Sequence, residues 1–190
     1  GLSYDIINSN DVSSTDFSIY GMILVGNEFF SNAAQIPVAN HNSLIINKFH
    51  ADEWSLSIRG LSSTASSQPL SIKNDDVDKI ITNGFGRVVQ AYTSCCFGNG
   101  ISLPIYAMSR IDRSLLGLYT ISTTMQDNPD PVIVAVFPGK NLFNNKVSNG
   151  RIVFFGAMES SFWTNDLKEI FKRSLLFTLN GNDADQDGHA

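Results

Sequence analysis

Runs of consecutive apolar residues, separated by polar connections, mark the strands expected in this chain. The first long run, at 21–26, has no polar residue on either face. Strands with this pattern are typical of parallel sheets that are covered on both faces, because neither side of the strand meets water. A second such strand is predicted at 151–156, after the turn dipeptide Asn149-Gly150. Further strands are predicted at 4–7, 36–39, 69–72, 87–92, 104–108, 116–121 and 132–137.

Helices are predicted between these strands and near the C-terminal end. Residues 28–34, 43–49 and 75–81 each indicate a short helix. The strongest pattern begins with Thr164 or Asn165 as the N-cap and stops at Asn180-Gly181. Because strands and helices alternate, the sequence predicts an α/β fold, a doubly wound and mostly parallel sheet with helices on both faces. The apolar residues that recur at helical spacing in the last helix are Leu167, Ile170, Phe171, Leu175 and Leu179.

The composition is that of a single globular domain. The 190 residues are 43% hydrophobic and 16% charged, which is enough apolar surface for a full core. The net charge is -5 and Lys and Arg do not cluster, so nucleic-acid binding is not expected. No apolar run approaches the roughly 20 residues that cross a bilayer, and no signal peptide is visible. The chain begins at Gly1 rather than Met, which indicates a processed or partial chain.

The composition changes sharply near the C-terminal end, so we predict a domain at 1–180 followed by an acidic segment at 181–190. Alternating Asp residues followed by Gly match the first positions of a calcium-binding loop, because a hard cation needs several oxygen ligands and then a sharp turn. The full pattern ends with a bidentate carboxylate about six residues further on. The alternative is an acidic, solvated tail. Calcium is the predicted cofactor, and its candidate ligands are Asp183, Asp185, Asp187 and His189.

Two cysteines and two histidines of the predicted domain are candidates for nucleophilic chemistry. Cys95 and Cys96 are adjacent, and a disulfide between neighbours is strained, so we expect two buried thiols. The alternative is a cysteine nucleophile activated in space by His41 or His50. These histidines lack the i, i+4 spacing of a helical metal pair, which favours ordinary hydrogen-bonded loop histidines.

The order of the apolar elements resembles a known fold. The opening Gly1-Leu2-Ser3-Tyr4-Asp5-Ile6-Ile7, the runs at 20–26 and 36–38, and the strand at 150–156 before the terminal helix resemble the class I glutamine amidotransferase-like fold, in particular its trehalose-utilisation (ThuA-like) branch. The resemblance implies a flavodoxin-like sheet over 1–180, whose first strand and first helix lie upstream of Gly1. The Asp-rich tail resembles the repeats of dockerins and of thrombospondin type 3 modules, which are extracellular calcium-binding families.

The catalytic residues implied by that resemblance are not found in this sequence. Active enzymes of the family carry a cysteine flanked by glycines on a tight strand-to-helix turn, and a His-x-Glu near the C-terminal end. The corresponding turn, 38–43, contains neither cysteine nor glycine, and 156–161 contains no histidine. The sequence therefore predicts a catalytically degenerate copy of the fold.

Aromatic side chains are the remaining candidates for a binding site, because flat rings stack on the apolar faces of sugars. Trp54 and the pair Phe162-Trp163 lie in loop-like segments, so we expect them to be partly exposed. Most of the others are expected in the core. The full set is Phe29, Phe30, Trp54, Phe85, Phe97, Phe154, Phe155, Phe162 and Trp163.

Together these features predict a non-catalytic structural or binding domain of a larger secreted or surface-displayed protein. Its partners would be other domains of the same polypeptide, protein partners in an assembly, or carbohydrate. A Ser- and Asn-rich, Lys-poor composition and the carboxylate loop favour a calcium-replete extracellular location, including a filament or virion surface. The alternative is a cysteine-dependent hydrolase or amidotransferase-like enzyme.

Overall fold

The computed structural model describes residues 3–58, 61–64, 69–73, 79–93, 103–108, 118–124 and 130–180. Short 3-10 helices of one or two turns connect many of its elements. The strands are β1 (Ile23–Val25), β2 (Ser43–Ile45), β3 (Ser62–Thr64), β4 (Leu70–Ile72), β5 (Val88–Val89), β6 (Ile105–Ala107), β7 (Leu118–Thr123), β8 (Pro131–Val136) and β9 (Ile152–Phe155), and the α-helices are α1 (Lys79–Thr82) and α3 (Asn165–Asn180).

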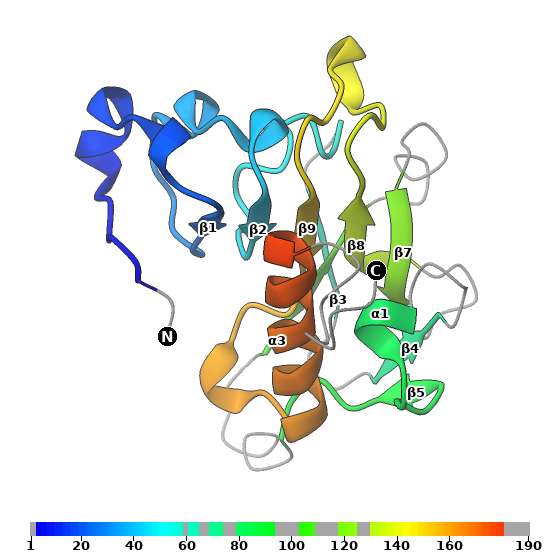
Figure 1. Cartoon of the computed structure of the whole chain (residues 1–190). Coiled ribbons are helices and arrows are strands. Elements are labelled where there is room, and N and C mark those ends of the chain that lie inside the picture. The colour runs from blue at the N-terminus through cyan, green and yellow to red at the C-terminus, as the bar shows by residue number, and fades with distance from the viewer. Residues whose placement is uncertain are drawn as a thin grey trace.

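Seven strands form one mixed sheet in the order β1-β2-β9-β8-β7-β4-β5, and β3 pairs with β6 in a separate two-stranded ribbon. The neighbours β1, β2 and β9 run parallel, whereas the pairs from β9 to β5 are antiparallel. Figure 1 shows these three parallel strands side by side, with α3 in front of β2 and β9. The predicted α/β fold is confirmed. The sheet was predicted to be mostly parallel, and the parallel pairs are β1 with β2 and β2 with β9.

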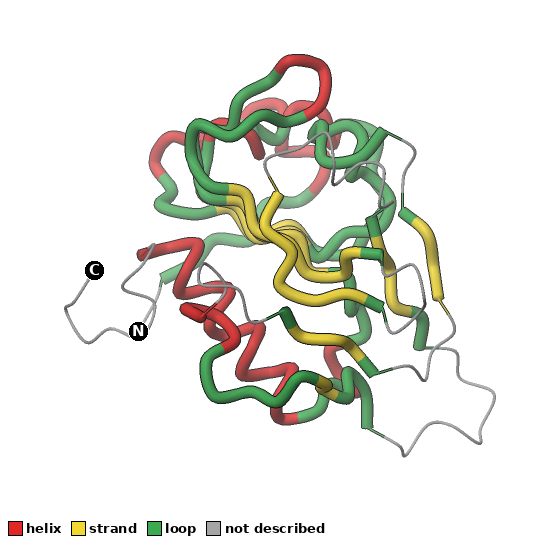
Figure 2. Tube along the Cα trace, turned by 90° about the vertical axis from the view of Figure 1, so that its right-hand side faces the viewer, coloured by secondary structure: helices red, strands yellow, loops and turns green. Residues whose placement is uncertain are grey.

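The two faces of the sheet are covered differently. On one face, α3 and α1 pack over a core that includes Leu44, Val153 and Phe155. On the other face, loops and short 3-10 helices cover Ile45 and Phe154. Figure 2 shows helices on one side of the strands and mostly loops on the other. Helices were predicted on both faces of the sheet. Within the described residues, α-helices cover only one of them, so this part of the prediction is wrong. We call these the helix face and the loop face.

Helix α3 begins and ends where the sequence predicted. The Thr164 hydroxyl accepts a hydrogen bond from the Leu167 amide at 3.2 Å, which identifies Thr164 as the N-cap. Two small polar residues face the sheet: the hydroxyls of Ser174 and Thr178 donate to carbonyls four residues earlier, so both are buried without an unpaired group. Of the predicted apolar stripe, Leu167 and Ile170 are buried, whereas Phe171, Leu175 and Leu179 are half-buried; Phe171 and Leu175 still pack against the core of this face. The buried residues are Leu167, Ile170, Ser174, Phe177 and Thr178.

Two glycines bracket the buried strand β9, and each is required by a close contact. A Cβ at Gly150 would lie 2.2 Å from the His41 carbonyl carbon. A Cβ at Gly156 would lie 1.9 Å from the carbonyl oxygen of Tyr106, where β6 crosses the end of β9. Real Cβ atoms do not approach backbone so closely, so glycine fixes both ends of this strand.

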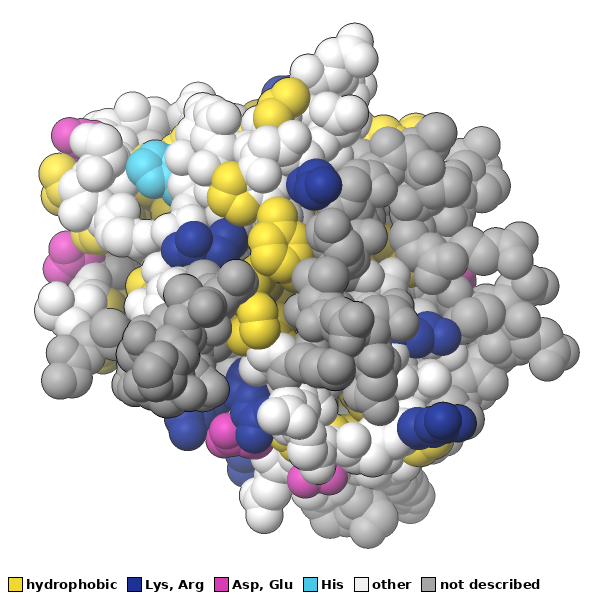
Figure 3. Space-filling view, turned by 45° about the vertical axis from the view of Figure 1, so that its right-hand side comes forward, with side chains coloured by type: hydrophobic (Ala, Val, Ile, Leu, Met, Phe, Trp, Pro, Cys, Tyr) yellow, Lys and Arg dark blue, Asp and Glu magenta, His cyan; other side chains and the backbone are white. Residues whose placement is uncertain are grey.

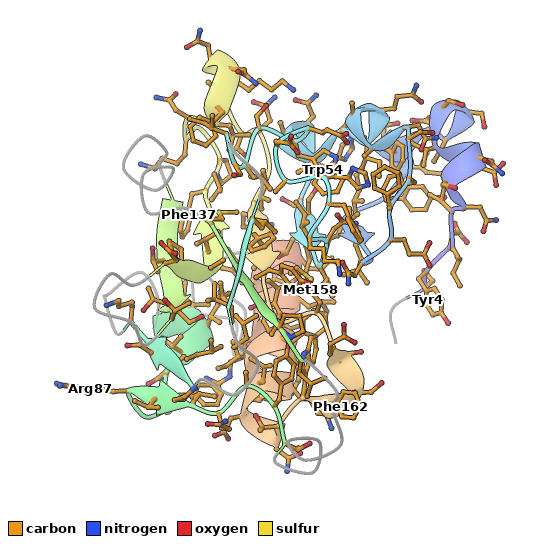
Figure 4. All side chains as sticks on the ribbon, turned by 180° about the vertical axis from the view of Figure 1, so that it is seen from behind. Tyr4, Trp54, Arg87, Phe137, Met158 and Phe162 are labelled. Carbon is orange, nitrogen blue, oxygen red and sulfur yellow. The ribbon has the colours of Figure 1, made fainter. Side chains whose placement is uncertain are left out.

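Four local predictions near the N-terminal end are wrong. Residues 4–7 form no strand, and Figure 4 shows Tyr4 at the edge of the molecule. Of the helix predicted at 28–34, only the 3-10 turn Ala33–Gln35 forms, and the strand predicted at 36–39 is instead the 3-10 turn Val38–Asn40, which follows Pro37. The helix predicted at 43–49 is strand β2 followed by a turn. Short apolar runs do not distinguish a buried strand from a buried helix by periodicity.

Candidate functional site

The carboxyl ends of β1, β2 and β9 meet at one edge of the sheet, because these three strands are parallel. In open α/β sheets this edge is where ligands bind. The chain segments that leave β1 and β2 run across the loop face, and β6 joins them there: the Tyr106 amide donates to the Gly156 carbonyl at 2.8 Å. Side chains from three distant parts of the sequence are thereby brought together.

Asn47 organises the turn after β2. Its side-chain amide nitrogen donates to the carbonyls of Gly26, at 2.7 Å, and of Glu28, at 2.8 Å. Its amide oxygen accepts from the backbone N–H groups of Phe49, at 2.8 Å, and of His50, at 3.2 Å. Asn47 is fully buried, so these four bonds satisfy all of its polar capacity. The amide fixes the segment after β1 against the segment after β2.

His50 is held on both of its ring nitrogens. Nε2 accepts a hydrogen bond from the Phe30 amide at 3.1 Å, and Nδ1 lies 2.9 Å from a carboxylate oxygen of Glu53. The Nδ1–H tautomer satisfies both contacts. The ring is only 1% exposed and is surrounded by Phe29, Phe30 and Trp54. Because its lone pair is used by a backbone donor, His50 has a structural role and is not placed as a base or metal ligand.

His41 lies at the opposite end of β2, two residues before the strand begins. It is close enough to Asp16 to contribute to lowering the pKa of that carboxyl, although the main cause is hydrogen bonding from Ser18. The two candidate histidines are therefore at opposite ends of one strand and do not form a pair. The turn at 38–43 precedes β2 and leads into a strand, so its assignment as a strand-to-helix turn is also wrong.

The other predicted site residues lie outside the described residues. These are the candidate nucleophiles and the candidate calcium ligands, namely Cys95, Cys96, Asp183, Asp185, Asp187 and His189. Among the residues that the structure describes, no group of three or more His, Cys, Asp and Glu side chains is arranged to hold a metal ion.

Lys48 and Tyr106 meet at the carboxyl edge. The Lys48 ammonium donates a hydrogen bond to the Tyr106 hydroxyl at 3.1 Å. It also lies 4.9 Å from the centroid of the Phe49 ring and 5.1 Å from that of the Tyr106 ring. These distances are in the range of cation–π contacts. Lys48 is half-buried, so two rings and one hydroxyl hold its charge at a defined position.

Phe29 and Phe49 expose their rings beside this lysine. Phe29 is 75% exposed and Phe49 is 43% exposed, and their centroids lie 5.8 Å apart in an edge-to-face arrangement.

The prediction of exposure for Trp54 and Trp163 is wrong: both are buried, and their indole N–H groups donate to the carbonyls of Ala33 and Ala157. Figure 4 shows Trp54 among the side chains of the loop layer.

Tyr92 is a buried polar group with a structural role. Its hydroxyl donates to the Pro104 carbonyl at 3.1 Å. Burial raises its pKa far above the usual range, so the phenol stays neutral. Tyr92 also forms an isolated antiparallel bridge with Trp163, which ties the residues before α3 to the segment after β5.

Sequence reasoning missed Lys48, Phe49 and Tyr106. The signal for the first two was present: an Asn directly follows the apolar run that forms β2, and a buried Asn commonly marks the end of a strand by bonding to nearby backbone. Assigning 43–49 to a helix concealed it. Tyr106 has no comparable signal, because its position depends on the crossing of β6 over β9.

The surface in Figure 3 carries scattered Lys and Arg side chains with acidic ones among them. Within the described ranges, no helix has the length and apolar character needed to cross a membrane. Comparison of the chain with family models, curated proteins and solved structures finds no match.

Proposed function

We propose that this chain is a non-catalytic carbohydrate-binding domain of a larger secreted or surface-displayed protein. The observation that carries the proposal is the exposed pair of rings, Phe29 and Phe49, at the carboxyl edge of the parallel strands. Exposed aromatic rings that are fixed in position stack on the apolar faces of sugars. Leaving two of them in water is unfavourable unless a ligand or partner covers them.

The surroundings of the rings favour binding over catalysis. His50, the histidine nearest to them, uses both ring nitrogens in contacts within the protein. Asn47 is likewise saturated. The described residues at this edge present two ring surfaces and an ammonium group to a ligand, and these supply affinity and orientation.

The same arrangement supports a flavodoxin-like, amidotransferase-related origin for the domain. Three parallel strands end at the proposed site. In doubly wound folds, ligands bind at the carboxyl ends of the parallel strands. Here the turn after the central strand of the three, β2, presents Asn47 and Lys48 and no cysteine. We propose that a binding surface replaces the nucleophile in this copy.

The experiment is a binding screen on an array of immobilised neutral and acidic oligosaccharides, with Phe29→Ala and Phe49→Ala tested beside the unchanged protein. Val88→Ala is the matched control, because Val88 is 51% exposed and lies on β5 at the other edge of the sheet. We expect binding that both Phe variants reduce by about tenfold or more and that Val88→Ala leaves unchanged. An array without binding, or binding that survives both Phe variants, contradicts the proposal.

A cysteine-dependent hydrolase is the alternative function, with Cys95 or Cys96 as nucleophile. It predicts release of ammonia from glutamine or hydrolysis of an activated ester, abolished by a Cys→Ser change at either position. We expect the unchanged protein and both Ser variants to show the same background rate. A rate above background that one Ser variant removes would establish an enzyme.

We also propose that the segment beginning at Asp183 binds calcium and orders the boundary after α3. The support is the alternation of Asp183, Asp185 and Asp187 before Gly188. Calorimetric titration with millimolar calcium, on a chain that continues for about 20 residues beyond Ala190 to supply a distal carboxylate, is expected to give heat that Asp185→Asn abolishes. No heat under these conditions would contradict the calcium loop.

A further inference from the structure

Lys48 is a cation without a carboxylate partner in the described part of the chain. The only hydrogen bond that its ammonium group makes there is to the neutral Tyr106 hydroxyl, although an ammonium group has three donors. By contrast, Lys172 and Arg173 on α3 both lie within ion-pair distance of Glu169. In a chain with net charge -5, acidic side chains are in excess, yet none of the described ones neutralises Lys48.

The position of Lys48 is fixed rather than mobile. Its backbone N–H donates to the side-chain oxygen of Asn27 at 3.3 Å, which fastens it to the segment after β1. Its ammonium is placed by the rings of Phe49 and Tyr106. A preorganised, half-buried cation binds an anion more strongly than a flexible surface lysine, because less side-chain entropy is lost and fewer waters screen the charge.

Phe49 connects this cation to the exposed rings. The centroid of its ring lies 4.9 Å from the Lys48 ammonium and 5.8 Å from the centroid of the Phe29 ring. A ligand that covers both rings therefore extends to the lysine. The amide nitrogen of Asn27, which has no protein partner among the described residues, adds a neutral donor at the same edge.

We propose that Lys48 binds the carboxylate of an acidic glycan whose successive sugar rings pack against Phe49 and Phe29. This inference rests on the proposed carbohydrate-binding function and adds the class of ligand, a glycan that contains uronic acid. A single ammonium with one neutral donor suits one carboxylate, whereas phosphate is more often held by several cations or by backbone N–H groups. An extended peptide is less suited, because the edge strand β1 has only 3 residues for it to pair with.

The test uses one charged ligand and its neutral counterpart. Binding of trigalacturonic acid and of its fully methyl-esterified form is measured by calorimetry at low and at physiological salt. We expect the acid to bind at least tenfold more tightly than the ester, with the difference shrinking as salt is added.

Variants assign the effect to Lys48. Lys48→Gln is expected to bring the affinity for the acid to about that for the ester, and Lys48→Arg to retain most of it. Lys168→Gln removes the same charge from an exposed position on α3 and is expected to change nothing. A thermal melt of each variant confirms folding, and if Lys48→Gln does not fold, the ester comparison on the unchanged protein still decides the question.

Each outcome has a definite meaning. Equal affinity for acid and ester overturns the role of Lys48 but leaves the proposed sugar-binding function in place. A tenfold preference that Lys48→Gln does not reduce also overturns the inference. If neither trisaccharide binds while the array shows a neutral sugar ligand, the acidic-glycan class is wrong and the domain function stands. If a peptide with an acidic residue competes for the rings and no sugar binds, both proposals fail.

Discussion

The helix face and the loop face of the sheet are stabilised by different means. On the helix face, α3 satisfies most of its own backbone groups and packs on the strands mainly through apolar side chains such as Phe177 and Ile170. On the loop face the backbone is irregular, and buried N–H and C=O groups need other partners. Side chains supply some of them: Asn47, His50 and Trp54 all bond to backbone atoms. Regular structure on one face and specific polar side chains on the other thus complete one fold.

This difference explains why the candidate site lies on the loop face. A helix that covers a sheet leaves few backbone turns from which side chains can project toward a ligand. The loop face has many, and they are held rigid by saturated groups such as Asn47. Binding residues are commonly placed on loops that a rigid scaffold positions. The exposed ring of Phe49 directly follows Lys48 and Asn47 in that arrangement.

The largest effect is expected from the helix face. Phe177→Ala removes a ring that is 1% exposed and packs edge-to-face on Phe137. The loss of buried area and the resulting cavity are expected to lower the free energy of unfolding by about 3–5 kcal/mol. Chemical denaturation measures it. Leu24→Ala, at a side chain that is 52% exposed, is the control and should change stability little. Similar losses in the two variants would show that α3 does not anchor the core.

On the loop face, we expect the loss of a buried hydrogen bond to lower stability more than a change in apolar packing. His50→Phe preserves the ring but leaves the Phe30 N–H without an acceptor and Glu53 without its partner. An unsatisfied buried donor is expected to lower the free energy of unfolding by about 2 kcal/mol. His41→Phe, at the other end of β2, is the matched control and should have a small effect. Denaturation curves compare them, and a neutral His50→Phe would mean that apolar packing alone holds this face.

The helix face was more predictable from the sequence than the loop face. Helix α3 has a capping residue, an apolar period and a stop signal within its own sequence, so local rules locate it. The loop face depends on contacts between distant segments. The Asn47 side chain donates hydrogen bonds to the carbonyls of Gly26 and Glu28, and no local sequence pattern predicts these contacts. The strand β2 was mistaken for a helix because its three residues are all buried and show no alternation.

The candidate site shows the same limit. His50 could be selected from the sequence as a polar residue near aromatic ones, but its role depends on the Phe30 amide, which only the fold brings to Nε2. Exposure was assigned to Trp54 because it lies in a loop, yet this loop folds back over the sheet and buries it. Loop residues are not uniformly exposed when loops form one of the two covering layers.

A contact that joins the start of β9 to the last turn of α3 is expected to contribute less to stability. The Arg151 side chain, at the start of β9, donates to the carbonyls of Thr178, at 3.1 Å, and Leu179, at 2.8 Å, in the last turn of α3. These carbonyls have no partner within the helix, and a cation there also complements the helix dipole. Arg151→Ala is expected to lower stability by about 1.5 kcal/mol. Hydrogen exchange should show earlier opening in the last turn of α3. Arg87→Ala, at an exposed arginine, is the control, and equal effects would contradict the capping role.

The smallest effect should be a gain, and it tests how far the loop face has been optimised. Ser55 has a φ of 61°, in the left-handed region that favours glycine, and its buried hydroxyl has no hydrogen-bond partner among the residues that the structure describes. Ser55→Gly removes both the strain and the unpaired hydroxyl, at the expense of greater freedom in the unfolded chain, and is expected to stabilise the protein by about 1 kcal/mol. Ser55→Ala removes only the hydroxyl, so the difference in melting temperature between the two variants reports the backbone strain less the entropy cost of glycine. If Ala stabilises as much as Gly, the strain at this turn does not exceed that entropy cost and the loop face is limited mainly by its polar groups.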